Sequence, residues 1–295
     1  MTIRFLIISL ALFSGNVLCA QNDLDFVSKY NLNLVVEIPD LAHVESVAFD
    51  ASTQLLYASI QGNQEPGDGS IVTFQLDGSM EDIAFTTGLN NPKGIAIYKN
   101  KLYVSDVTEL VEIDLQTGNI LNRFSTGTEQ FLNDVAIDAD GNVYVSDMGS
   151  SSIYKLETDG KFTNWLSSPK LENPNGLLVK DNTLFIAAWG LPDKTNNASN
   201  PQGRFLKVDL TTKIIDQVTE TPQGNLDGLQ VLDDQNFLIS DWRKGTILKI
   251  SKSGVTELFF TSKISVGDIL YLQKEKLLVI PLNRQNKVEI YKITD

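Results

Sequence analysis

The stretch NDVAIDADGNVYVSD, residues 133–147, contains two short strand-like segments separated by a polar turn. The second segment places Val143 and Val145 at alternate positions and is rich in residues that favour β-strands. The intervening residues 138–142 carry Asp, Gly and Asn, which are typical of tight turns. The stretch therefore predicts two antiparallel strands joined by a short connection.

The same pair of segments recurs five more times along the chain. The six copies begin at residues 45, 93, 133, 175, 227 and 267, so successive copies start 48, 40, 42, 52 and 40 residues apart. This period suits one four-stranded blade of a β-propeller. The other five pairs are 45–49 with 55–59, 93–97 with 101–106, 175–179 with 183–187, 227–231 with 236–241, and 267–271 with 276–280.

A third alternating segment follows each pair, and the N-terminal region carries one more strand-like run. The third segments span residues 70–76, 109–115, 152–157, 204–210, 245–251 and 287–293. The extra run, residues 32–38, has no blade of its own, and the last copy lacks an outermost strand. Pairing the two would close the ring and remove a sheet edge. We therefore predict an all-β fold, a six-bladed β-propeller whose N-terminal strand completes the last blade, with residues 21–295 forming one domain.

The first twenty residues have the character of a secretory signal peptide. Arg4 precedes an apolar run at residues 5–13, and smaller residues follow up to Ala20. The run is too short to span a bilayer. Cleavage after Ala20 predicts an exported protein, either periplasmic or secreted. Lipid anchoring at Cys19 is the less favoured alternative, because Leu18 stands where lipoprotein signals carry a small residue.

The charge of the chain restricts its partners. The sequence has 24 Lys and Arg residues against 37 Asp and Glu residues, a net charge of −13. Removing residues 1–20 removes one Arg, which leaves 23 against 37, or −14. Nucleic acids and anionic membrane surfaces attract basic proteins, so we expect neither as a partner. The short apolar run at residues 5–13 leads us to expect no membrane span. An acidic chain is compatible with a cation site but does not by itself establish one.

One position of the repeat gathers polar side chains that propeller symmetry would direct toward a common axis. We expect the first residue of each copy to lie just before the strand that lines the central channel, at the channel mouth. Around the ring this position holds Glu45, Lys93, Asn133, Asn175, Asp227 and Gly267. Two carboxylates and two amide oxygens suit Ca²⁺, whereas zinc and copper favour His and Cys.

A purely structural interpretation of these residues also stays open. Asn-Asp, Asn-Gly and Asp-Gly pairs are common turn signals, so Asn133, Asn175 and Asp227 could simply reverse the chain. Glu45 is a poor turn former at the equivalent position. That residue favours the metal-site interpretation.

Four short motifs resemble the senescence-marker-protein/gluconolactonase family of six-bladed propellers, also called regucalcin-like. The motifs are those around Glu45 and Asn133 and the phrases Pro174-Asn175-Gly176 and Asp227-Gly228-Leu229. As architecture the resemblance covers roughly residues 30–295, and residues 142–149 also resemble the generic NHL repeat. The resemblance implies a divalent cation, expected to be Ca²⁺, held by Glu45, Asn133, Asn175 and Asp227, with Asp227 as the general base of a lactonase.

Two departures from the family pattern bear on the substrate. Ser46-Val47-Ala48 replaces the Gly-Pro and aromatic residue that usually follow the family's Glu, and Phe131 stands where sugar lactonases commonly carry an Arg. An aldonolactone substrate is therefore in doubt. Lys93 on the neighbouring blade could stabilise the developing oxyanion instead, and charge compensation beside two carboxylates is its alternative role.

Three further side chains have two interpretations each. His43, two residues before Glu45, is either a structural hydrogen-bonding residue or part of the chemistry. Trp189 and Trp242 each follow a second strand, and they either wall a pocket at the mouth or pack in the core.

The signal peptide and the resemblance together predict an exported, metal-dependent hydrolase, expected to use calcium, acting on a small-molecule lactone or related ester. The alternative is a non-catalytic binding module of the NHL-repeat type for a ligand or protein partner, in which any calcium is structural. A channel filled by side chains would favour the module. An open pocket above the four oxygen ligands would favour the enzyme.

Overall fold

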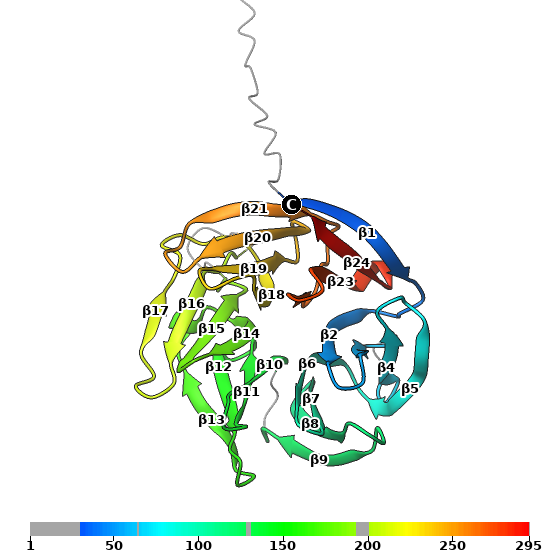
Figure 1. Ribbon diagram of the computed structural model, residues 1–295. Helices are drawn as coiled ribbons and strands as arrows, with labels where there is room; N and C mark the ends of the chain where they lie inside the picture. The colour runs from blue at the N-terminus through cyan, green and yellow to red at the C-terminus, as the bar shows by residue number, and fades with distance from the viewer. Residues whose placement is uncertain (1–29, 64, 128–130, 193–200, 295) are drawn as a thin grey trace, which may run out of the picture.

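Each copy of the repeat forms the inner strands of one antiparallel sheet, and six such sheets surround a central axis (Figure 1). The computed structural model describes residues 30–63, 65–127, 131–192 and 201–294. The predicted six-bladed β-propeller is confirmed. Residues 1–20, interpreted as a signal peptide, lie outside the described residues. Within the described part of the chain, no helix is long and apolar enough to cross a membrane.

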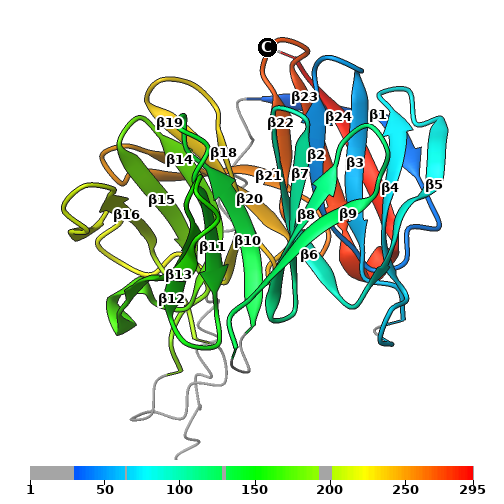
Figure 2. The same cartoon turned by 90° about the horizontal axis from the view of Figure 1, so that it is seen from below.

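The two inner strands of each blade correspond to the repeated pair of segments. The innermost strands are β2 (Val44–Asp50), β6 (Pro92–Tyr98), β10 (Leu132–Ile137), β14 (Pro174–Lys180), β18 (Leu226–Val231) and β22 (Leu270–Leu272). The second strands are β3 (Leu55–Ile60), β7 (Lys101–Asp106), β11 (Val143–Asp147), β15 (Thr183–Ala188), β19 (Asn236–Asp241) and β23 (Leu277–Leu282). Figure 1 shows the innermost strands closest to the central axis, and Figure 2 shows the blades from the side.

The two outer strands complete each blade. The third strands are β4 (Gly69–Gln75), β8 (Glu109–Asp114), β12 (Ser152–Leu156), β16 (Phe205–Asp209), β20 (Thr246–Ser251) and β24 (Lys287–Thr294). The outermost strands are β5 (Met80–Leu89), β9 (Ile120–Ser125), β13 (Phe162–Ser167), β17 (Ile215–Gln217), β21 (Thr256–Thr261) and β1 (Asn31–Ile38). Two 3-10 helices, η1 (Pro169–Leu171) and η2 (Asn283–Gln285), lie in connections.

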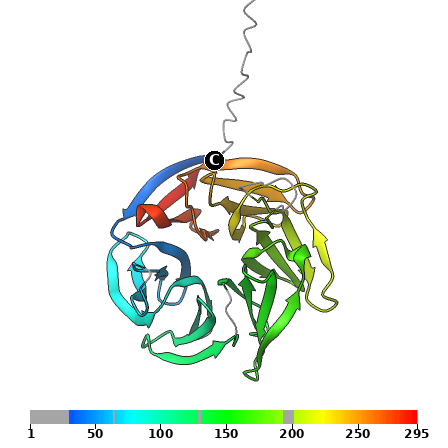
Figure 3. The same cartoon turned by 180° about the vertical axis from the view of Figure 1, so that it is seen from behind.

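The N-terminal strand closes the ring, as predicted. β1 pairs antiparallel with β24, from Asn31 opposite Thr294 to Ile38 opposite Val288. Figure 3 shows β1, in blue, beside β24, in red, in this last blade. Because the strand supplied by the N-terminus covers the free edge of β24, the last blade has the same four strands as the others.

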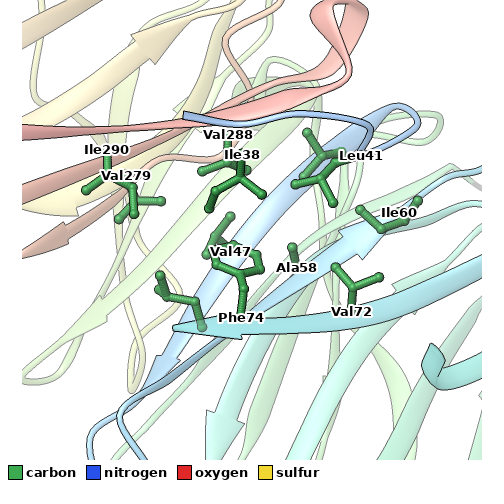
Figure 4. Close-up of a cluster of buried hydrophobic side chains, with 12 residues drawn as sticks. Ile38, Leu41, Val47, Ala58, Ile60, Val72, Phe74, Val279, Val288 and Ile290 are labelled. Carbon is green, nitrogen blue, oxygen red and sulfur yellow. The ribbon is translucent and has the colours of Figure 1, made fainter. Parts of the chain in front are cut away.

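Buried apolar side chains form six clusters, one at each interface between neighbouring blades. In the cluster between the last and first blades, Ile38, Val47, Phe74, Val279 and Val288 pack together (Figure 4). Fully burying a side chain of this size contributes about 1.5–3 kcal/mol. The clusters therefore hold the blades against each other and fix the innermost strands, on which the site is built.

Candidate functional site

Five residues of the predicted ring occupy the same place in five blades. Each is the second residue of an innermost strand: Glu45, Lys93, Asn133, Asn175 and Asp227. We expected them just before the strands or in turns, and both expectations were wrong because each lies inside a strand. The pairing between innermost and second strand shifts register at this point in all five blades. Such a β-bulge re-aims a side chain, which explains how residues of regular strands point into a shared space.

The five side chains line one cavity of about 340 Å³. The remaining lining residues are His43, Gln61, Phe131, Met148, Trp189, Trp242, Asn283 and Arg284. Gly267, the sixth member of the predicted ring, is not among the described residues that line this cavity. The structure therefore brings together all four expected metal ligands and Lys93, under an open space that a small molecule could enter.

A larger groove of about 720 Å³ lies between the first two blades, away from this cavity. Its acidic residues are Asp50, Glu81 and Asp82, of which the last two are exposed. The Asp50 carboxylate already accepts hydrogen bonds from Ser52 and Thr53 in its own turn. We therefore assign the candidate site to the smaller cavity, where buried polar groups converge.

The four expected ligands are buried and two of their oxygens lack a partner. Glu45, Asn133, Asn175 and Asp227 are 3%, 6%, 1% and 4% exposed. The Nδ2 of Asn175 donates to the Leu226 carbonyl at 3.1 Å, while its Oδ1 and the Oε2 of Glu45 are buried without a hydrogen-bond donor. An unsatisfied buried acceptor costs about 1–3 kcal/mol. A hard cation would satisfy both oxygens, so this set fits Ca²⁺.

No three His, Cys, Asp or Glu side chains in the described part of the chain are grouped as a metal site. The expected ligand set contains only two such residues, Glu45 and Asp227. Its other two members are amides, Asn133 and Asn175. A site of this composition depends on amide oxygens, which bind calcium well and zinc poorly.

Burial and neighbouring negative charges raise the pKa values of Glu45 and Asp227. Burial, followed by the charge of Asp268, raises the pKa of Asp227 to about 7, and the Asn175 hydrogen bond and the Lys93 charge oppose this rise. Burial, followed by the charge of Asp227, holds the pKa of Glu45 well above its ordinary value, again opposed by Lys93. A divalent cation would reverse both effects, because it favours the ionised carboxylates.

Lys93 and His43 both lie in the cavity lining. The Lys93 ammonium is 5.0 Å from the centre of the Phe131 ring, and its charge lowers the pKa of both site carboxyl groups. His43 has a left-handed backbone with φ of 53°, which its N–H stabilises by donating to Asn286 Oδ1 at 2.9 Å. The Nδ1 of His43 is buried without a partner.

A second pair of buried carboxylates was missed by sequence reasoning. Asp134 and Asp268 line another cavity, about 240 Å³, formed by the innermost strands. Asp134 Oδ2 accepts the Leu177 N–H at 2.6 Å, and Asp268 Oδ2 accepts the Ser46 hydroxyl at 2.8 Å. Both contacts cross to the next blade, so the two residues tie blades together. The sequence did carry a signal for them, because each directly follows the first residue of a repeat copy, Asn133 or Gly267.

The pKa values of Asp134 and Asp268 are raised as well. Burial, followed by the charge of Asp268, raises the pKa of Asp134 well above its ordinary value. Burial raises the pKa of Asp268 to about 6, against hydrogen bonds from Ser46 and from the Leu229 backbone. Four buried carboxyl groups with raised pKa values thus surround the central axis.

Serine residues near the ends of second strands hold the site backbone in place. The Ser146 hydroxyl accepts the Asp134 N–H at 2.8 Å and donates to the Asn175 carbonyl of the next blade at 2.7 Å. Ser240 makes the equivalent pair of contacts, and Ser105 donates to the next blade in the same way. The recurring serine of the repeat therefore spaces the ligand-bearing strands around the ring.

Fold and site together define a class of protein, a six-bladed β-propeller with a polar, largely buried site in a central cavity. No family model matches the sequence, and no curated protein matches it. Solved structures do match. One is a gluconolactonase from Xanthomonas campestris, with a TM-score of 0.65 and 17% identity, covering 90% of this chain and 90% of that chain.

Two further solved structures match the fold. A luciferin-regenerating enzyme matches with a TM-score of 0.65 and 16% identity, over 90% of this chain and 95% of its own. Virginiamycin B lyase from Staphylococcus aureus matches with a TM-score of 0.63 and 9% identity, over 90% of this chain and 100% of its own. The resemblance to gluconolactonase-type six-bladed propellers is thus confirmed at the level of the fold.

Proposed function

We propose that this protein is an exported, calcium-dependent hydrolase of a lactone or related ester. The observation that supports this most strongly is the convergence of Glu45, Asn133, Asn175 and Asp227 in one cavity, with two of their buried oxygens lacking a partner. The shared fold with a gluconolactonase is consistent with the proposal.

The ring residues Glu45, Lys93, Asn133, Asn175 and Asp227 form the floor of the cavity. Each has a proposed task. Glu45, Asn133, Asn175 and Asp227 would hold Ca²⁺, which when bound would supply a Lewis acid that polarises the substrate carbonyl. Asp227 accepts the proton of the attacking water, and the cation would keep this carboxyl ionised so that it can act as the general base. Lys93 provides positive charge for the oxygen that becomes negative.

The bonds of the proposed reaction balance without a further reactant. The oxygen of one water molecule forms a bond to the carbonyl carbon, and the ring C–O bond breaks. The proton that Asp227 takes from the water is delivered to the departing ring oxygen, which becomes a hydroxyl group. One lactone and one water thus give one hydroxy acid.

The open cavity favours this enzyme over the alternative, a non-catalytic module of the NHL-repeat type. A module that binds a protein partner needs no open space above buried metal ligands, whereas a hydrolase does. The space of about 340 Å³ is at the lower end of the range for small-molecule sites.

The test is a panel of lactones and esters incubated with the calcium-loaded protein. We expect acid release from at least one lactone, loss of that release when EDTA removes the metal, and recovery when Ca²⁺ is restored. A pH-indicator assay measures it. Absence of hydrolysis across the panel by a calcium-loaded, folded protein would contradict the proposal and favour the binding module.

A further inference from the structure

A second ring of residues forms the wall of the cavity above the floor. Its members are the residues that directly follow the second strand of each blade: Gln61, Val107, Met148, Trp189, Trp242 and Asn283. All except Val107 line the cavity. The chemistry of the wall can therefore be read blade by blade around the axis.

The wall is divided into an apolar side and a polar side. Met148, Trp189 and Trp242 come from three consecutive blades, the third to the fifth, and form the apolar side. Asn283 and Gln61 come from the sixth and first blades, and the Nδ2 of Asn283 donates to Gln61 Oε1 at 3.2 Å. A ligand that fills the cavity meets aromatic surface on one side and polar groups on the other.

The two tryptophans are held by backbone hydrogen bonds on both sides. The Trp189 N–H donates to the Asn173 carbonyl at 2.9 Å, and its carbonyl accepts the Asn225 side chain at 3.0 Å. The Trp242 N–H donates to the Asn225 carbonyl at 3.0 Å, and its carbonyl accepts the Ser265 N–H at 2.6 Å. Because the backbone at both tryptophans is fixed before a ligand arrives, binding here costs little backbone ordering.

Phe131 extends the apolar side toward the floor. Its N–H donates to Asp147 Oδ1 at 3.0 Å, and its ring lies 5.0 Å from the Lys93 ammonium. The Arg243 guanidinium lies 5.7 Å from the Trp189 ring. Phe131 is 43% exposed and lines the cavity, so its ring is available to a ligand there.

We propose that the substrate is an amphipathic lactone or ester that carries an aryl or medium-length alkyl substituent; this rests on the proposed hydrolase function. The substituent packs against Trp189, Trp242, Met148 and Phe131, and the ring oxygens face the floor and the polar side. A polyhydroxylated sugar lactone fits poorly. Its hydroxyl groups would be desolvated against the aromatic side without hydrogen-bond partners.

The test measures binding of lactams, ring amides that resist hydrolysis, to the calcium-loaded protein by titration calorimetry. We expect a phenyl-substituted lactam to bind about tenfold or more tightly than the unsubstituted ring and than the lactam of gluconic acid. Trp242→Ala should lower this preference about tenfold. Trp242→Phe should recover part of it.

A tryptophan outside the cavity provides the matched control. Trp165 on β13 packs against Tyr144, so Trp165→Ala removes the same side chain without touching the wall and should keep the preference. The proposal is overturned if the gluconic lactam binds as tightly as the phenyl lactam. It is also overturned if folded Trp242→Ala keeps the full preference.

The binding and hydrolysis experiments together can reject the proposed function and the proposed ligand class independently of each other. A Trp242-dependent preference for apolar lactams in a protein that hydrolyses no lactone supports the ligand class and rejects the hydrolase. Hydrolysis of a sugar lactone in preference to substituted lactones supports the hydrolase and rejects the ligand class.

Discussion

Replacing Asp227 with Asn is expected to lower kcat/KM for the best lactone by at least about 10³-fold. The change keeps the size of the side chain but removes its charge and its ability to accept a proton. General-base catalysis alone typically contributes 10²–10⁴-fold, and Asp227 is also a proposed calcium ligand. The assay is lactone hydrolysis with the parent and the variant at saturating Ca²⁺.

Asp216→Asn is the matched control for that variant. Asp216 is exposed on β17, the outermost strand of the fourth blade, so the same chemical change there should leave kcat/KM at the parent value. Retention of more than a tenth of the parent kcat/KM by Asp227→Asn would remove Asp227 from the chemistry.

The metal-free protein is expected to lose stability as pH rises from about 5 to 8. Asp227 and Asp268 have folded-state pKa values of about 7 and about 6, raised from 3.8. In this window the folded protein keeps protons that the unfolded chain has released, so the free energy of unfolding falls with pH. Each unit of pKa difference corresponds to about 1.4 kcal/mol, so the loss should reach several kcal/mol.

Other carboxyl groups have the opposite effect on the free energy of unfolding, but only below the range of pH 5 to 8. Hydrogen bonds within turns lower the pKa of Asp77, Asp114 and Asp209. Their contribution to stability is lost only as pH falls through those lowered values, below about 4. The slope between pH 5 and 8 therefore reports the buried central carboxylates.

Thermal unfolding of EDTA-treated protein measures this slope. At about 2–4 °C per kcal/mol, Tm should fall by roughly 10 °C between pH 5 and pH 8. Asp227→Asn should flatten the slope, and Asp216→Asn should keep it. A Tm that is constant or rises over this range would contradict the description of these carboxylates as desolvated and mutually repelling.

The fold followed from the repeat because its signal is strong at the centre of each blade. The second strands, such as β7 and β11, are buried along most of their length, and their Val, Tyr and Ser pattern recurs. The outermost strands carried little signal. β5 is mostly exposed and β17 has three residues, so neither shows the alternation that identifies a strand with one buried face.

The floor of the site was predictable, but its surroundings were less so. Asn133 and Asp227 stood out because a symmetric repeat brings equivalent positions together. The β-bulges that turn these residues inward leave no residue-type signature, so they were placed before the strands instead of inside them. Asp134 and Ser146 act through contacts with the next blade, which only the assembled ring reveals.

The wall of the cavity was also only partly predictable from the sequence. Trp189 and Trp242 could be interpreted from sequence either as pocket walls or as packing residues. The structure shows that both are pocket walls, because both line the central cavity and follow equivalent strands. The division into an apolar and a polar side depends on which blades are neighbours across the closed ring.

Calcium titration of the EDTA-treated protein at pH 7.5 tests the central claim most directly. Calorimetry should detect one Ca²⁺ per chain in the parent, and no binding in Asn175→Leu, which removes a buried ligand oxygen but keeps the side-chain size. At a hundredfold excess over Kd, bound Ca²⁺ should also add about 2.7 kcal/mol to the free energy of unfolding. No binding to the folded parent, or equal binding to folded Asn175→Leu, would contradict a calcium site at the centre of this propeller.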